Sequence, residues 1–343
     1  MITLKHIAAE AGATIATVSM ALRGSPLISV ARRVEINEIA RRLGYQRNAH
    51  VSTLMKHIRQ GGGRMPRKAA IAFLMAHPSR NARKEFVFVD RRFRGMEVRL
   101  AERGYRPDFF WYNDPDMPPE RLEKIWSARG IRGAVLALFR EFEPAIELDW
   151  EKFAVATQSD FSLGPPIHRV MEDYFTNTVT AMRHLRQSGC RRIGLAYSCV
   201  NARSARFHIA AAYHESIAQV QGSFDNIPSI HIPDTPEGWT EQAFMAWFRR
   251  EKPDAVLTFN WYVRDWLLAA GKRIPEDVSI AVLNRCPSSP EFSGIDPQPE
   301  LLGETSVDLV IEQLENNECG LPKNPKVLTI PGRWVQGTTT REP

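Results

Sequence analysis

The hydrophobic positions at the start of the chain recur at helical spacing in three short runs. This pattern predicts three helices, within residues 3–12, 15–24 and 29–44. Thr3 and Ser29 precede the first and third runs, where a hydroxyl can cap a helix by accepting from a backbone N–H. The apolar positions of the three runs are Leu4, Ile7, Ala8, Ala11, Ile15, Val18, Ala21, Leu22, Ile36, Ile39, Ala40 and Leu43. Two short helices joined by a tight turn, with a third across them, form a helix-turn-helix unit.

From residue 69 onward, hydrophobic residues occur in short continuous runs instead. Such runs are typical of strands that are buried on both faces of a parallel sheet. The runs cover residues 69–75, 132–138, 192–197, 255–259 and 279–283. Amphipathic segments lie between them, and one of these predicts a helix that ends near Gly104. Alternating strands and helices of this kind predict an α/β fold with doubly wound parallel sheets.

Basic residues are concentrated at the N-terminal end of the chain. Residues 1–68 hold 12 Lys and Arg against three Glu, a net charge of +9, whereas the other 275 residues carry −3. Such asymmetry is typical of a short module that binds a polyanion, although a solvated basic surface would have the same composition. The helix-turn-helix pattern in the same segment favours DNA as the polyanion.

The remaining composition is that of an ordinary globular protein. The 343 residues are 43% hydrophobic, which is enough for about two domains with their own cores. No apolar run is long enough to span a bilayer, and the N-terminus lacks the apolar segment of a secretory signal. The four cysteines form no C-x-x-C pair, so we expect neither a zinc ribbon nor a disulfide scaffold. A reducing cytoplasm fits this usage.

The second predicted helix is the candidate reader of DNA bases. Its first turn and exposed face carry Ile15, Ala16, Thr17, Ser19 and Met20. Hydroxyl groups suit contacts to phosphates, whereas Ile, Ala and Met side chains offer apolar contact to thymine methyl groups. We therefore expect this helix to contact base edges of double-stranded DNA.

A dense series of motifs runs through the same segment. It consists of Thr3-Leu4-Lys5-x-Ile7-Ala8, Ala11-Gly12-Ala13, Thr17-Val18-Ser19, Ala21-Leu22-x-Gly24, Ser29, Arg33 and Leu43-Gly44-Tyr45-x-x-Asn48-Ala49. In number, order and spacing, this series resembles the lactose/galactose repressor family of bacterial transcription factors. The resemblance implies that residues 1–46 are a helix-turn-helix headpiece that binds DNA. It adds further residues to the expected DNA contacts, namely Thr3, Arg23, Ser29, Arg33, Tyr45 and Asn48.

Two positions depart from the family pattern. The family usually has Arg where this chain has Met20, and Pro where it has Arg47. The missing arginine is a side chain that can bind guanine through two hydrogen bonds. The operator sequences of relatives therefore do not carry over to this chain.

Residues 47–60 match the hinge helix of the family, and the three consecutive glycines within residues 61–67 predict a flexible linker. The hinge segment is too short to hold a helix alone, so we expect it to fold when DNA is bound. In the family, the hinge inserts a leucine between base pairs in the minor groove, and Leu54 occupies the matching position. The residues alone favour packing of Leu54 against the headpiece, whereas the resemblance favours the wedge.

The resemblance extends through the body of the chain, which begins at residue 68. It rests on Gly189-x-x-Arg192-Ile193-Gly194, Pro253-Asp254-Ala255-Val256, Ile274-Pro275-Glu276-Asp277-Val278-Ser279, Leu302-Gly303-x-Thr305-Ser306-Val307-Asp308 and Ile330-Pro331. Family members fold this region as two α/β subdomains, similar to periplasmic sugar-binding proteins, with an effector between them. The implied subdomains are 68–163 with 294–319, and 164–293 with 320–341. A homodimer joined through the body, on a roughly palindromic operator, is also implied.

Effector-binding residues are expected at the carboxyl ends of the strands. The resemblance implies Trp239, whose indole can stack on a sugar, and Asn260, whose amide can bind hydroxyl groups. It adds Asp173 at the entrance of the cleft, Asn284 in place of an acid, and Arg206 near the position of an arginine that binds ligand. Core packing or surface exposure accounts for such residues equally well. Because the cleft departs from the family pattern, we expect a sugar-like or related metabolite rather than a standard hexose.

The sequence contains no arrangement of residues that is typical of catalysis. It has no G-x-G-x-x-G after a strand, no phosphate-binding loop, no H-E-x-x-H and no nucleophile elbow. We therefore expect no enzymatic activity, no cofactor and no metal ion. The sequence predicts a cytoplasmic transcriptional regulator, a repressor, whose affinity for its operator a small molecule controls. Two alternatives stay open: a ligand-independent architectural DNA-binding protein, and an α/β enzyme with a DNA-binding appendage.

Overall fold

The structure is a computed structural model that describes residues 4–22, 25, 27–43, 69–112, 114, 118–138, 148–158, 165–205, 207–221 and 228–342. The chain divides into two compact units, Met1–Pro66 and Arg67–Pro343. The headpiece lies in the first unit and the body in the second. The expected hinge helix at 47–60 and linker at 61–67 lie outside the described residues. Among the residues described, no helix is both long enough and apolar enough to cross a membrane.

The headpiece consists of the three helices that the sequence predicts, α1 (Leu4–Glu10), α2 (Ile15–Ala21) and α3 (Val30–Arg42). Ser29 caps α3 as expected, since its hydroxyl accepts from the backbone N–H of Arg32. A single apolar core holds the helices together, and its buried members are Ile7, Ala8, Ala11, Val18, Ala21, Ile36, Ile39 and Ala40. These are all positions that helical spacing placed in the three runs.

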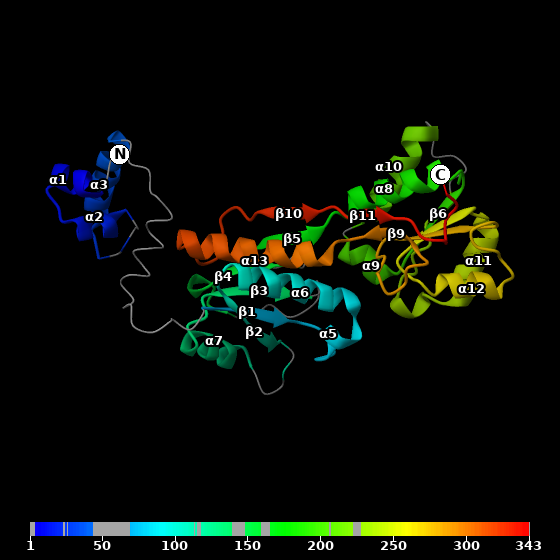
Figure 1. Ribbon diagram of the computed structural model, residues 1–343, viewed down its shortest axis with the longest axis horizontal. Coiled ribbons are helices and arrows are strands. Elements are labelled where there is room, and N and C mark those ends of the chain that lie inside the picture. The colour runs from blue at the N-terminus through cyan, green and yellow to red at the C-terminus, as the bar shows by residue number, and fades with distance from the viewer. Residues whose placement is uncertain are drawn as a thin grey trace. The chain divides into compact units, whose positions relative to one another are not determined.

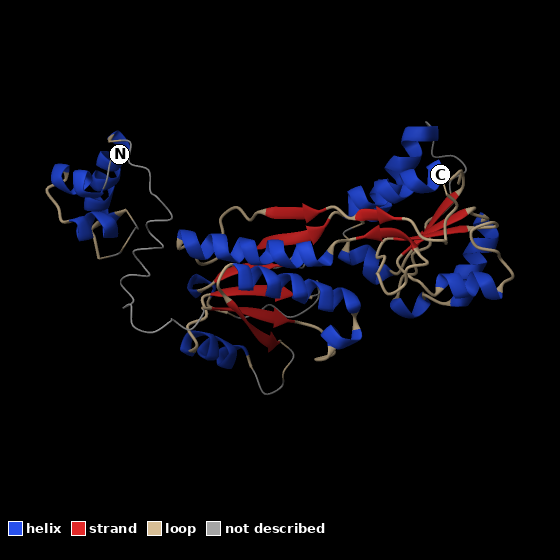
Figure 2. Ribbon diagram, in the orientation of Figure 1, coloured by secondary structure: helices blue, strands red, loops and turns tan. Residues whose placement is uncertain are grey.

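The first sheet of the body has six parallel strands in the order β10-β5-β4-β3-β1-β2 (Figures 1 and 2). The strands are β1 (Ala70–Met75), β2 (Arg106–Trp111), β3 (Gly133–Ala137), β4 (Ala154–Thr157), β5 (His168–Glu172) and β10 (Val327–Ile330). The helices around it are α5 (Ala82–Glu85), α6 (Val87–Glu102), α7 (Pro119–Ala128), the 3₁₀ helix η1 (Trp150–Lys152) and α13 (Pro299–Asn316).

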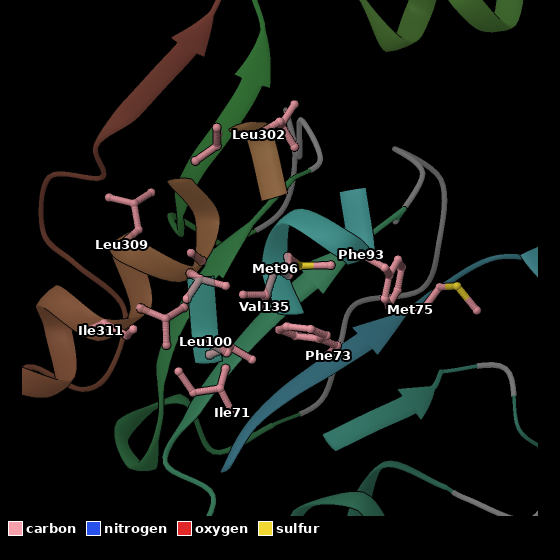
Figure 3. Close-up of a cluster of buried hydrophobic side chains, with 14 of the residues drawn as sticks. Ile71, Phe73, Met75, Phe93, Met96, Leu100, Val135, Leu302, Leu309 and Ile311 are labelled. Carbon is pink, nitrogen blue, oxygen red and sulfur yellow. The ribbon is translucent and has the colours of Figure 1, made fainter. Parts of the chain in front are cut away.

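Helices cover both faces of this sheet. Ile71 and Phe73 of β1 pack into one core together with residues of α6 and α13 (Figure 3). Leu74 points to the opposite face, where it joins a second core with Trp126 of α7. The continuous apolar run in β1 is thereby explained, because successive side chains of a strand face opposite sides and both sides are buried.

The second sheet has five strands in the order β11-β9-β8-β7-β6, and β11 alone runs antiparallel to its neighbour. The strands are β6 (Ile193–Ala196), β7 (Ala255–Thr258), β8 (Ser279–Val282), β9 (Ser293–Asp296) and β11 (Arg333–Val335). The helices of this half are α8 (Tyr174–Gln187), α9 (Cys199–Ser204), α10 (His208–Gln221), the 3₁₀ helix η2 (Pro236–Gly238), α11 (Glu241–Glu251) and α12 (Val263–Ala269). All five apolar runs that predicted strands are strands of one sheet or the other.

The chain passes three times between the two sheets, and each crossing is later than the expected boundary. The crossings lie between β5 and α8, between β9 and α13, and between β10 and β11, because β5 and β10 belong to the first sheet and β9 to the second. The expected boundaries at 163, 293 and 319 were therefore wrong by about ten residues at the first and last crossing and by a few at the second. The strands before the crossings are short, and β5 and β10 include polar or exposed residues, so no apolar run marks them.

Candidate functional site

The helix α2 presents one face to solvent and buries the other. Val18 and Ala21 are buried in the core of the headpiece, which fixes the orientation of the helix. Ile15 is 49% exposed and Ala16 is also exposed, whereas Ser19 and Met20 are half-buried. These four positions share one helical face. Because the opposite face of α2 is fixed in the core, this face is the one that the helix can present to a partner, and it is a candidate contact surface.

Thr14 caps α2, a role that the sequence analysis missed. Its hydroxyl accepts from the backbone N–H of Thr17 at 3.1 Å and lies 2.8 Å from the Thr17 hydroxyl. A threonine directly before the helical run was the signal that could have identified it. The pair of hydroxyls lies at the N-terminus of α2, where the helix dipole and free N–H groups favour an anion. The expected phosphate contact of Thr17 remains a prediction.

The acidic side chains of the headpiece are partly neutralised within it. Glu10 pairs with Arg42, and Glu35 pairs with Arg32 at 2.7 Å. Arg32 also donates to the backbone oxygen of Ala11 at 2.6 Å and so ties α3 to the end of α1. The net positive charge of residues 1–68 would attract the phosphates of DNA.

Two expected DNA-contacting residues lie at the start of α3, and six other expected site residues lie outside the described part of the chain. Ser29 is exposed and Arg33 is half-buried at the start of α3. The expected residues outside the described part of the chain are Thr3, Arg23, Tyr45, Asn48, Leu54 and Arg206. Their contacts remain predictions.

In the body, the expected effector residues Asn260 and Asn284 lie at the same edge of the second sheet. They follow β7 and β8, which are neighbouring parallel strands, so their carboxyl ends meet at one edge. Trp261 joins the two loops, because its indole N–H donates to Asn284 Oδ1 at 3.1 Å. The centroid of the same indole ring is 6.5 Å from that of Phe88, which lies on α6, a helix that packs against the first sheet. This contact brings the two halves of the body together at the carboxyl edge.

Trp239 lies in an aromatic cluster on the α11 side of the second sheet. Its ring centroid is 5.2 Å from that of His231, 6.2 Å from that of Phe244 and 6.2 Å from that of Trp266. Burial lowers the pKa of His231, so that the imidazole is neutral at physiological pH. Trp239 is half-buried, and its contacts give it a packing role alongside any contact with a ligand.

Asp173 lies at the first crossing between the sheets. Its carboxylate accepts from the backbone N–H and from the hydroxyl of Thr176, both at 2.9 Å, and so caps α8. Its own backbone N–H donates to the backbone oxygen of Ile330, next to the third crossing. Asp173 therefore anchors the start of α8 at the crossing, and its contact with a ligand remains a prediction.

The sequence analysis did not predict a role for two consecutive arginines of α6. They bind the last residues of β5 and β9, the strands that precede two of the crossings between the sheets. Arg91 binds Asp296, the last residue of β9, through two hydrogen bonds of 3.1 Å, and also binds Glu300 at 2.6 Å. Arg92 binds Glu172, the last residue of β5, at 2.6 Å. Burial raises the pKa of Glu172, and the charge and hydrogen bond of Arg92 oppose that shift. Such pairs have no local sequence signal, because the partners are far apart in the chain.

Comparisons with known proteins agree with this arrangement. Residues 3–48 match the family model of the bacterial regulatory proteins, lacI family, and residues 182–340 match that of the periplasmic binding protein-like domain. Together the two models match more than half of the chain. A comparison with curated proteins finds no match.

Solved structures of transcriptional regulators share the fold. The regulator CelR in complex with cellobiose is 19% identical with a TM-score of 0.61, over 99% of this chain and 100% of that one. The Lac repressor dimer bound to operator and the anti-inducer ONPF is 18% identical with a TM-score of 0.56, over 98% of each chain. The regulator CcpA of Lactococcus lactis is 14% identical with a TM-score of 0.59, over 80% of this chain and 100% of that one. At these identities the likeness concerns the fold alone.

Proposed function

The chain belongs to the lacI family of bacterial regulatory proteins, and from this premise we propose that it represses transcription by binding an operator sequence in DNA. The observation that carries the proposal is the exposed face of α2, within the segment that matches the family model. A helix-turn-helix unit places such a face in the major groove. Base edges would contact Ile15, Ala16 and Met20, and phosphates would contact Thr17 and Ser19.

We further propose that a small molecule bound between the two sheets of the body controls the affinity for DNA. Support comes from the match of residues 182–340 to a periplasmic binding protein-like domain. It also comes from the CelR structure, which is a complex with cellobiose, and from the Lac repressor structure, which is bound to the anti-inducer ONPF. A sugar-like effector is the class that these relatives favour.

The protein would act as a homodimer on a roughly palindromic operator, in the cytoplasm and without enzymatic activity. The Lac repressor structure is described as a dimer on its operator, which supports this assembly. In a two-fold dimer each headpiece meets one half-site. A stable monomer in sedimentation at micromolar concentration would contradict the proposal.

The test is binding of the full chain to DNA fragments that it selects from a random pool, measured at several salt concentrations. Because the headpiece is strongly basic, the logarithm of the association constant should fall steeply with the logarithm of salt. A chain that begins at Lys68 should lose this binding. A salt slope near zero, or equal binding by the shortened chain, would contradict the proposed function.

A further inference from the structure

The carboxyl edge of the second sheet, where β6, β7 and β8 end, brings together polar groups from three loops. The strands are neighbours in the sheet and parallel. Tyr197 follows β6 directly, Asn260 follows β7, and Arg285 follows β8. All three side chains carry hydrogen-bond donors.

Two of these donors are buried without a partner among the described residues. The side chain of Tyr197 is 0% exposed, and neither its hydroxyl nor the Asn260 amide nitrogen Nδ2 has a hydrogen bond there. Burial raises the pKa of Tyr197 to about 12, so the hydroxyl stays protonated and can donate. Buried polar groups in proteins are nearly always paired. The Asn260 amide nitrogen therefore lacks an acceptor, and the Tyr197 hydroxyl, which can both donate and accept, lacks a partner of either kind.

Arg285 adds a positive charge at the same edge. Its Nε donates to the backbone oxygen of Phe292 at 3.1 Å, and this bond holds the half-buried guanidinium in place. No carboxylate in the described part of the chain pairs with its two terminal nitrogens. A guanidinium with free paired N–H groups is suited to binding a phosphate or carboxylate through two hydrogen bonds.

The carboxylates at the strand ends around this edge are already used by the chain itself. Glu172 pairs with Arg92, Asp296 pairs with Arg91, and Asp173 accepts from Thr176. One buried acceptor, Gln158 Oε1 at the end of β4, has no partner among the described residues, and it is uncharged. At this edge, the described groups without partners are therefore one amide N–H donor, one hydroxyl, one positive charge and one amide oxygen.

Aromatic rings also lie at this edge, packed with the core on one face of the second sheet, whereas Tyr197 packs in the core on the other face. The rings of Trp261 and Phe292 are stacked with centroids 6.0 Å apart, and Phe88 approaches Trp261 from the first sheet. Phe292 is also the residue whose backbone oxygen holds Arg285. Phe292 is buried in the core, whereas the half-buried indole of Trp261 is suited to packing against the apolar face of a ring-shaped ligand.

We propose that the effector is a carbohydrate carrying a phosphate or carboxylate group, whose anionic oxygens are bound by Arg285 with help from Asn260 and Tyr197. The inference rests on the proposed function, because it names the ligand class of the same site. Trp261 supplies the apolar face for the sugar ring, and Gln158 accepts from a hydroxyl. An uncharged sugar leaves Arg285 without its counter-ion.

Matched sets of probes test this inference on the full chain. Glucose, galactose and mannose are each compared with their 6-phosphate and their uronate, by thermal shift and by titration calorimetry. At least one phosphate or uronate should raise the melting temperature well above the effect of its neutral parent sugar. Phosphate and uronate arms show which anionic group is preferred. Equal stabilisation by the neutral sugar, or no stabilisation by any probe, overturns the inference.

Three variants locate the binding of the best anionic probe. Arg285→Gln should weaken it about tenfold or more, whereas Arg249→Gln removes an equal charge from an exposed position on α11 and should leave it unchanged. Tyr197→Phe removes only a hydroxyl without a partner, so it should weaken the probe without lowering the melting temperature of the free protein. Equal losses in the Arg285 and Arg249 variants, or unchanged affinity in the Arg285 variant, would overturn the assignment.

Operator binding by the same proteins separates this inference from the proposed function. If the chain binds its operator but prefers neutral sugars, the inference about the effector is wrong and the proposed function stands. If the chain binds no DNA at moderate salt, the proposed function is wrong, whichever ligand it binds.

Discussion

The headpiece and the body differ in how far apart in the sequence their functional groups lie. On α2, the candidate DNA-contacting residues fall within two turns of one helix. In the body, the groups at the carboxyl edge of the second sheet come from three separate strand ends, with Phe88 added from α6. The residues of the first site are close together in the sequence and can be recognised from their spacing. The residues of the second site come together only when the sheet has formed. This difference decides which functional residues a sequence can reveal.

The two units also differ in the size of their cores. The buried core of the headpiece consists of alanines with four larger aliphatic residues. The body buries whole aromatic side chains, among them Phe73, Trp126 and Trp247. A small unit with a modest core has little stability to lose, so the headpiece should unfold after a change that the body would survive.

The largest expected effect follows from Ile36→Asn in the headpiece. Ile36 is 0% exposed, and a buried amide without partners in its place should cost about 3–5 kcal/mol. This is comparable to the whole stability of so small a unit, so the headpiece should unfold and operator binding should disappear. Hydrogen exchange resolved along the chain measures each unit separately, and exchange in the body should be unchanged.

Val256→Asn is the matched control for that experiment. Val256 is 0% exposed in β7, so the substitution should destabilise the body and leave headpiece exchange unchanged. If either substitution raises exchange in both units equally, the units do not fold independently and the comparison fails.

Arg92→Met in the body should cost a similar free energy but have a smaller effect on folding, because the larger body has more stability to lose. The substitution leaves Glu172, which is 9% exposed, without its partner, and should lower the free energy of unfolding by about 3–5 kcal/mol at neutral pH. Adding Glu172→Gln should restore most of this loss, because an amide costs less to bury than an unpaired carboxylate. Thermal unfolding of the two variants measures both effects.

The pH dependence of the Arg92 variant has a definite sign. Burial raises the pKa of Glu172, and removing Arg92 takes away the groups that oppose this shift. The folded variant therefore holds a proton that the unfolded chain releases, so its stability falls as pH rises from the usual pKa of Glu to the raised one. The deficit relative to the unchanged protein should shrink on going from neutral pH to about pH 5. An equal deficit at both pH values would contradict this account.

The sequence predicts most of the secondary structure but misplaces the boundaries between the two halves of the body. Helical spacing identified α1, α2 and α3, and continuous apolar runs identified β1, β3, β6, β7 and β8. These elements are fixed by the burial of their own residues. The strand β5, with the sequence HRVME, gives no such signal, because its pairing with β4 and β10 and the contact of Glu172 with Arg92 come from distant parts of the chain.

Site prediction follows the same division. On α2, the sequence placed Val18 and Ala21 on the buried side, while of the five expected contact residues Ile15 and Ala16 are exposed and the other three are half-buried. At the carboxyl edge of the second sheet, it placed Asn260 and Asn284 but gave no indication that Tyr197 lacks a partner. The absence of a hydrogen bond depends on every neighbour of an atom, and spacing along one segment cannot supply that information.

The smallest expected effect, and the sharpest test of α2, is Met20→Ala. Met20 lies half-buried on the exposed face, so the substitution should leave headpiece folding nearly unchanged. If Met20 contacts a thymine methyl group, the preference for that base should fall by about 1 kcal/mol at one position of each half-site. The binding preferences of the two proteins on a randomised operator measure this change.

Ser19→Ala, one position earlier on the same face, is the matched control. A hydroxyl that binds phosphate carries no sequence information, so its loss should weaken binding to all sequences alike. An unchanged base preference in the Met20 variant, combined with a shifted one in the Ser19 variant, would reverse the assigned roles.

Arg285→Gln in the body should change neither the base preference nor the salt slope of ligand-free protein. A changed base preference would show that Arg285 in the body affects how α2 contacts DNA, and the two sites would then not act independently.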